Sequence, residues 1–131
     1  MLKYIIKGSV DPAKIAELRK SVGWNGMEDS YKKSLANSFL YICCYDNDNL
    51  VGFLDVVSNG VTDAYIQDVV VNPGYQGKGI GTELMNMAIE KLKTEGIYAI
   101  SVLFDKDLQS FYEKFGFNIM MSGQMVTREE D

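Results

Sequence analysis

Three glycines at alternate positions mark the segment of this chain whose chemistry is easiest to interpret. Gly77, Gly79 and Gly81 follow the apolar run at 69–71 and lead into a segment with helical periodicity. The first N–H groups of a helix have no intrahelical partner and lie at the positive end of its dipole, so they attract anions. Glycines let a bulky anion approach the backbone, and Lys78 adds a positive charge. The pattern predicts a phosphate-binding turn, although a tight turn alone would also need glycines.

Two common nucleotide-binding patterns do not fit this turn. A Walker loop requires G-x-x-x-x-G-K-[ST], but here Lys78 is followed by Gly79, and position 72 is Asn. A dinucleotide fingerprint requires G-x-G-x-x-G, whereas the glycines here strictly alternate. A protein that binds ATP or NAD at this turn is therefore the least favoured of the alternatives.

The residues around the turn resemble a known family. The string Q-x-x-G-x-G at 76–81 fits the pattern Q/R-x-x-G-x-G/A. Downstream, D-x-x-L-x-x-F-Y-x-x-x-G-F at 105–117 resembles N-x-x-A-x-x-L-Y-x-x-x-G-F. Both patterns are typical of the GNAT superfamily of acyl-CoA-dependent N-acetyltransferases, and the resemblance covers about residues 39 to 117. Asp105 replaces the family's usual Asn, and Leu108 replaces its Ala.

The resemblance implies a site for acetyl-CoA, with no metal. The diphosphate is expected on the backbone amides of the turn, with Gln76 at the entrance: Gly77, Lys78, Gly79, Ile80, Gly81 and Thr82. The pantetheine arm is expected to pair with the strand formed by Val69, Val70 and Val71, where the family splays its fourth and fifth strands apart. Asp105 joins this predicted cofactor site through the family's polar contact at that position.

Direct attack on a thioester requires an unprotonated amine. An amine with a pKa near ~10.4 is mostly ammonium at neutral pH, and removing its proton costs about 4.6 kcal/mol. The chain has no histidine, so the proton acceptor is a carboxylate, a water relay or bulk solvent. Asp68, directly before the valine run, is our candidate, with an ordinary outward-facing residue as the equal alternative. The weaker candidates are Glu28, Asp29, Asp55 and Asp63.

Tyr112 has two interpretations. The family pattern makes it the proton donor to the leaving thiolate, whose thiol has a pKa near ~8.5. Periodicity alone places it in the core, because it shares an apolar stripe with Leu108, Phe111 and Phe115. The Phe-Tyr-x-x-x-Gly-Phe context favours the catalytic interpretation.

The elements needed to position these residues follow from apolar periodicity and turn signals. Asp11-Pro12 predicts a helix start, and Asn59-Gly60 predicts a hairpin. Strands are expected at 2–7, 39–45, 50–58, 64–71, 97–104 and 117–121, and helices at 12–22, 29–37, 81–95 and 107–115; the tail 128–131 is expected to fray. The fold class is α/β: one domain over residues 1–131, with a central mixed, mostly antiparallel sheet flanked by about four helices.

Composition limits the classes of partner. A net charge of -5 argues against a nucleic-acid partner, and no apolar run approaches membrane-spanning length. The adjacent Cys43 and Cys44 are expected to be reduced, and the location to be the cytoplasm. We therefore expect an N-acetyltransferase that acts on a small-molecule or peptide amine, and the family resemblance makes a homodimer possible. The alternative is a non-catalytic acyl-CoA-binding or regulatory module on the same fold.

Overall fold

A computed structural model describes all residues from Met1 to Asp131. Its elements, in chain order, are β1 (Leu2–Ile6), α1 (Pro12–Ser21), α2 (Glu28–Ser34), β2 (Leu40–Asp46), β3 (Asn49–Ser58), β4 (Asp63–Val71), α3 (Ile80–Thr94), β5 (Ala99–Val102) and α4 (Gln109–Glu113). Short 3-10 turns extend α2 to Asn37 and precede α4 at Lys106–Leu108. None of the helices has the length and apolar composition needed to span a bilayer.

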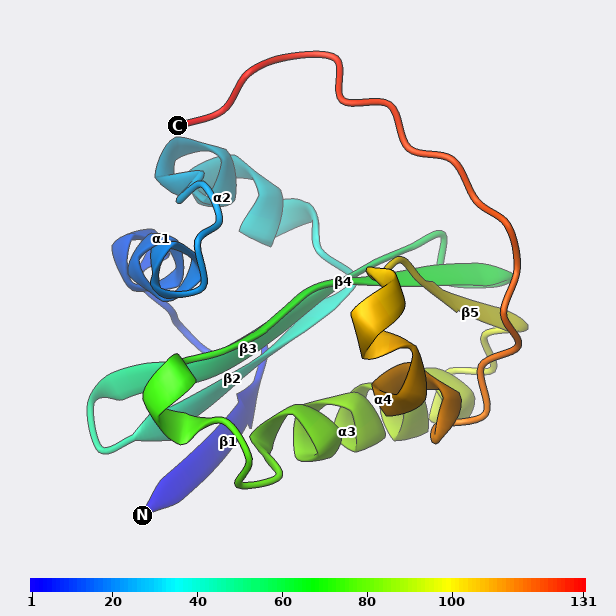
Figure 1. The fold of residues 1–131 in the computed structure, drawn as a ribbon, viewed down its shortest axis with the longest axis horizontal. Coiled ribbons are helices and arrows are strands. Elements are labelled where there is room, and N and C mark those ends of the chain that lie inside the picture. Colours follow the sequence, from blue (N-terminus) through cyan, green and yellow to red (C-terminus); the bar gives the residue numbers. More distant parts are fainter.

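The five strands form one sheet in the order β1-β2-β3-β4-β5. The first four strands are antiparallel to their neighbours, and β5 pairs with β4 in parallel after the crossover through α3. α1 and α2 cover one face of the sheet, while α3 and α4 lie on the other (Figure 1). The predicted fold class, a mixed and mostly antiparallel sheet with four helices, is confirmed.

Each face of the sheet has its own hydrophobic core. On one face, α3 buries a stripe at helical spacing, namely Ile80, Leu84, Met85, Ala88 and Leu92. On the other face, Ile15 and Leu18 of α1 and Tyr31 of α2 pack against Phe53 and Val70. β4 therefore contributes to both layers, and its position depends on helices on both sides.

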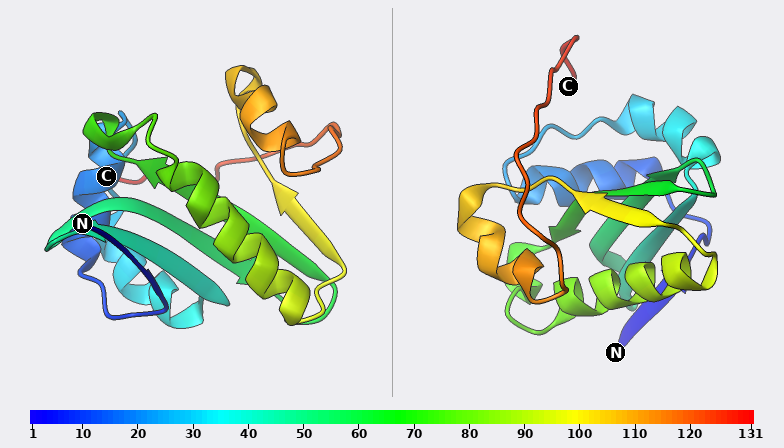
Figure 2. Two further views of the ribbon diagram at one scale, coloured as in Figure 1. Left: turned by 90° about the horizontal axis from the view of Figure 1, so that it is seen from below. Right: turned by 90° about the vertical axis from the view of Figure 1, so that its right-hand side faces the viewer.

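Two irregularities of β4 open the sheet near its end. Its parallel pairing with β5 stops at Ile66 opposite Val102, so the remaining residues of β4 have no strand on that side. Its pairing with β3 shifts between Gln67 and Val70, and Asp68 in this bulge has a φ of 58°. β5 leads away from β4 toward α4, which creates the divergence expected from the resemblance (Figure 2).

The predicted strand at 117–121 is wrong. Gly116 has a φ of 96°, and no residue after it joins the sheet, in which β5 is the last strand. The following segment is extended but unpaired, and it runs back to lie beside α2 (Figure 1). The prediction that residues 128–131 fray is also wrong, because the Met27 N–H donates to the Asp131 carbonyl at 2.9 Å and the Ser30 hydroxyl donates to the Glu130 carboxylate at 2.8 Å.

The start of α1 provides a test of the local folding rules. The Asp11 carboxylate accepts a hydrogen bond from the Ala13 N–H at 2.9 Å, and Pro12 occupies the first turn. Asp11→Ala should lower the free energy of unfolding by about 1 kcal/mol, because a first-turn N–H loses its acceptor. Urea unfolding measures this loss. Glu17→Ala, an exposed change in the same helix, should leave stability nearly unchanged, and equal losses in both variants would contradict the capping role.

Candidate active site

A cleft of about 560 Å³ lies between the end of β4, the glycine turn, the start of α3 and the start of α4. Most of its lining is apolar, and the rest is glycine backbone with a few polar side chains. The lining residues are Val22, Trp24, Val69, Val70, Val71, Tyr75, Gln76, Gly77, Gly79, Ile80, Gly81, Thr82, Leu108, Phe111, Tyr112 and Lys114. The glycine turn and the segment at 105–117, which were predicted to form one site, therefore line the same cleft.

The glycine turn leaves its backbone donors free. Asn72 accepts from the Gly74 N–H at 2.9 Å and closes a tight bend after β4. Gly77 and Gly79 then adopt φ values of 79° and 86°, in the left-handed region that favours glycine. From residue 77 to 82 no N–H donates within the chain, and the first α3 bond runs from Glu83 to the Gly79 carbonyl at 3.0 Å. These donors form a preformed anion site at the start of a 15-residue helix.

Gly81 keeps this helix start close to α4. A Cβ on Gly81 would lie 3.4 Å from the Phe111 ring and 3.7 Å from Val71. Any larger side chain there would project between the two walls of the cleft. Position 81 therefore has room for a Cβ but not for a larger side chain, whereas Gly77 and Gly79 are needed for backbone conformation.

The end of β4 presents polar backbone groups to the cleft. The Asn72 N–H bonds to the Val51 carbonyl at 2.8 Å, and the next pair along, Gly52 and Val71, lies directly opposite. Because hydrogen-bonded and non-hydrogen-bonded pairs alternate in an antiparallel ladder, the N–H and C=O of Val71 point away from β3. The Gln76 side-chain amide donates to this carbonyl at 3.0 Å. Val71 can therefore pair with an extended ligand arm.

Two lysines flank the turn in different ways. Lys78 lies outside the lining, with its ammonium 5.3 Å from the centre of the Tyr75 ring, and Tyr75 donates to Asp46 at 2.5 Å. Lys114 does line the cleft, where it donates to Thr82 at 2.8 Å and lies 4.5 Å from the centre of the Phe111 ring. Lys78 stands within the glycine motif and was a predicted binding residue, whereas no sequence signal pointed to Lys114.

The two interpretations of Tyr112 are both compatible with its position. The residue is 6% exposed. The centre of its ring lies 4.6 Å from that of Phe104, on which it stacks, and 5.0 Å from that of Phe111, which it meets edge to face. Tyr112 nevertheless also lines the cleft. Its hydroxyl makes no hydrogen bond to another residue. Burial, with a smaller contribution from Tyr65, raises the pKa of Tyr112 to about 12, so the phenol stays protonated at neutral pH.

None of the predicted carboxylates lines the cleft. Asp105 precedes the 3-10 turn before α4, and its side chain makes no capping bond. Glu28 and Asp29 lie on α2 beside Lys32, and Asp63 is an exposed residue at the start of β4. Asp55 is 1% exposed, accepts from Gln67 at 3.3 Å, and has its pKa raised by desolvation. The catalytic and binding roles predicted for these residues stay predictions.

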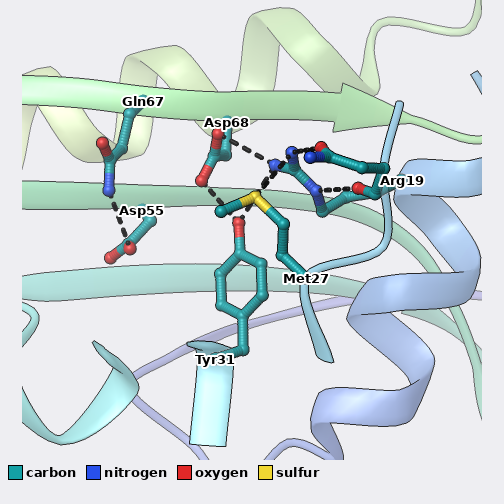
Figure 3. A network of polar contacts seen from close by, with 7 residues as sticks. Arg19, Met27, Tyr31, Asp55, Gln67 and Asp68 are labelled. Carbon is teal, nitrogen blue, oxygen red and sulfur yellow. Dashed lines mark hydrogen bonds and ion pairs between the residues drawn. The ribbon is translucent and has the colours of Figure 1, made fainter. Parts of the chain in front are cut away.

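Asp68 is held by partners on the other helical layer (Figure 3). Its carboxylate forms an ion pair with Arg19 at 3.0 Å and accepts a hydrogen bond from the Tyr31 hydroxyl. Burial and the nearby Asp68 charge raise the pKa of Tyr31, so this phenol remains a donor. A left-handed aspartate costs about 1 kcal/mol, and these contacts stabilise it. Its predicted role as proton acceptor stays a prediction.

Two further residues line the cleft without belonging to either sequence motif. Trp24 is 39% exposed and lines the cleft. Val22, at the end of α1, lines the same wall. Both residues come from the connection between α1 and α2, which no motif linked to the glycine turn.

Comparisons with known proteins identify the family. The model described as "Acetyltransferase (GNAT) family" matches residues 12–117. A Prochlorococcus marinus protein named "Uncharacterized N-acetyltransferase ycf52-like" is 33% identical over 120 residues, which are 88% of this chain and 67% of that protein. The Porphyra purpurea protein named "Uncharacterized N-acetyltransferase ycf52" is 36% identical over 110 residues, 79% of this chain and 62% of that one.

The fold comparison gives the same family. The crystal structure of a probable acetyltransferase from meticillin-resistant Staphylococcus aureus has a TM-score of 0.89 and 26% identity, covering 98% of this chain and all of that one. The chain spans about two thirds of the length of the curated Prochlorococcus relative and somewhat less of the Porphyra one. With both sequence motifs meeting in one cleft and a family match over residues 12–117, the chain belongs to the GNAT acetyltransferase family.

Proposed function

We propose that this protein transfers an acetyl group from acetyl-CoA to a primary amine, with both substrates bound at once. The observation that carries the proposal is the set of free N–H groups at residues 77–82, which open into an apolar cleft along the end of β4, where β4 has no neighbour on its β5 side. A ligand with a diphosphate at one end and an extended amide arm at the other matches both features.

The chain's own groups fit coenzyme A along its length. The helix start offers donors for the diphosphate, and the N–H and C=O of Val71, which point away from β3, offer strand-like pairing for the pantetheine arm once the arm displaces the Gln76 amide from the carbonyl. Lys114, held on Thr82, adds positive charge beside these donors. The apolar walls, which include Val69 and Leu108, suit the arm's methyl and methylene groups.

In this proposal acetyl-CoA supplies the activated acyl group, which an unprotonated amine attacks directly. Tyr112 lines the cleft with a free hydroxyl and serves as the donor to the sulfur as negative charge develops there. A phenol with a pKa of about 12 is a weaker acid than a thiol near ~8.5, so complete proton transfer is uphill. Its contribution is therefore mainly a hydrogen bond that strengthens as the carbon–sulfur bond breaks.

The acceptor in this proposal is a small-molecule or peptide amine. The net charge of -5 favours the approach of a cation, but no carboxylate lines the cleft to bind one specifically. A screen of primary amines for CoA release, spanning polyamines, arylalkylamines, aminoglycosides, amino acids and lysine peptides, tests the proposal. Turnover with an amine supports it. Binding of acetyl-CoA without turnover of any amine would favour the non-catalytic module instead.

Thermal stabilisation distinguishes coenzyme A from ATP as the ligand of the glycine turn. CoA at about 100 times its dissociation constant should stabilise the fold by about 2.7 kcal/mol, and ATP should not compete with it for the site. Stabilisation by ATP alone would contradict the assignment of the turn to coenzyme A.

Tyr112→Phe should lower kcat by about tenfold or more and leave acetyl-CoA affinity nearly intact. Phenylalanine preserves the stacking on Phe104 and Phe111, so only the hydroxyl is lost. Steady-state kinetics with calorimetry of CoA binding measures the two effects separately. Tyr98→Phe, at an 88% exposed position, is the matched control. An unchanged kcat in Tyr112→Phe would remove this residue from the mechanism.

Gly81→Val should weaken acetyl-CoA binding by about tenfold or more, because the new side chain would project toward Phe111 and Val71 across the cleft. Gly123→Val is the matched control, since a Cβ there meets nothing within 4 Å. Isothermal titration of both variants with CoA measures the change. Equal affinities would show that the helix start and α4 do not enclose the cofactor.

A further inference from the structure

Arg19 is a buried cation with no assigned role. It lies near the end of α1, with its side chain only 7% exposed. Burying a guanidinium is costly unless its charge and its donors all have partners. Its contacts divide into two groups, one on the connection between α1 and α2 and the other on β4 (Figure 3).

The first group of contacts fixes the connection from α1 to α2. The Arg19 Nε donates to the Asn25 carbonyl at 2.7 Å, and Nη2 donates to the Asn25 side chain at 3.0 Å. The guanidinium also lies 5.1 Å from the centre of the Trp24 ring. Trp24 and Val22 of this connection form one wall of the cleft. Arg19 therefore holds this part of the cleft lining in place without lining the cleft itself.

The second group of contacts fixes the bulge of β4. Nη1 of Arg19 pairs with Asp68 at 3.0 Å and donates to the Tyr31 hydroxyl at 3.2 Å, while Tyr31 itself donates to Asp68. Asp68 directly precedes the three valines of β4 that also line the cleft. Both carboxylate oxygens of Asp68 have partners in this chain, one in Arg19 and the other in Tyr31, so these contacts hold the bulge of β4 in place.

We propose that Arg19 is a positioning residue that fixes the α1–α2 connection relative to the end of β4, two parts of the cleft lining, and that it acts on β4 through Asp68. The planar guanidinium reaches Asn25 and Asp68 from different nitrogens at the same time. A lysine ammonium is a single point charge on a flexible stem and cannot hold both partners in one geometry. Asp68 is accordingly an anchor for the bulge and not the proton acceptor.

This inference rests on the proposed function, and kinetics of Arg19→Lys test it. The variant should raise the KM for acetyl-CoA by about tenfold and change kcat less, because the walls bind the arm in every state of the reaction. A purely structural role would lower the melting temperature without moving KM. Arg128→Lys, at the other arginine of the chain, is the matched control because its side chain is 70% exposed. An unchanged KM in a folded Arg19→Lys protein would overturn the proposal.

Asp68→Asn distinguishes an anchor from a proton acceptor. If Asp68 is an anchor, the Asp68→Asn variant should have a higher KM for acetyl-CoA and an unchanged pH dependence of kcat. The Arg19→Lys, Asp68→Asn double variant should be no worse than the more affected single variant, because both act through one contact. A large loss of kcat with an unchanged KM and a shifted pH profile would identify Asp68 as the proton acceptor and overturn its role as an anchor.

Amide hydrogen exchange separates failure of this inference from failure of the proposed function. Arg19→Lys should increase exchange at residues 24–27 and 67–71 and leave α3 unchanged, with or without ligand. If the wild-type protein binds no CoA, the proposed function fails, and the exchange pattern still tests the positioning role. Unchanged exchange in both segments would overturn it.

Discussion

The architecture of the cleft depends on the unpaired backbone donors between residues 77 and 82. Six successive N–H groups without partners are costly in a folded chain unless solvent or a ligand satisfies them. The positive φ values of Gly77 and Gly79 direct the backbone into this arrangement, and the dipole of α3 adds to its positive potential. The rest of the cleft extends this anion site into an elongated one, because β5 diverges from β4 and leaves Val71 exposed to pairing.

Much of this site was predictable because its determinants are local in sequence. The glycine spacing, the valine run and the Phe-Tyr-x-x-x-Gly-Phe segment each lie within about one turn or strand, where periodicity and capping rules apply. Periodicity correctly placed Tyr112 in the core, where it stacks on Phe104, and the residue also lines the cleft. Its catalytic role stays a prediction.

The parts that were missed depend on contacts distant in sequence. No local pattern pairs Arg19 with Asp68 or Lys114 with Thr82, and these contacts appear only when α1 packs on β4 and α4 on α3. The predicted strand at 117–121 has strand-like composition, but a strand also needs a neighbour, and these residues pair with no strand of the sheet. Local propensity predicted the elements well, whereas their partners were decided by the tertiary fold.

The most direct test of the central claim follows the backbone amides of residues 77–82 by NMR during titration. Coenzyme A should shift these six resonances strongly, whereas pantetheine, which lacks the diphosphate, should shift Val69 and Val71 and leave the turn nearly unchanged. Saturable binding of coenzyme A with no change at the turn would contradict the account, because the diphosphate would then be held elsewhere.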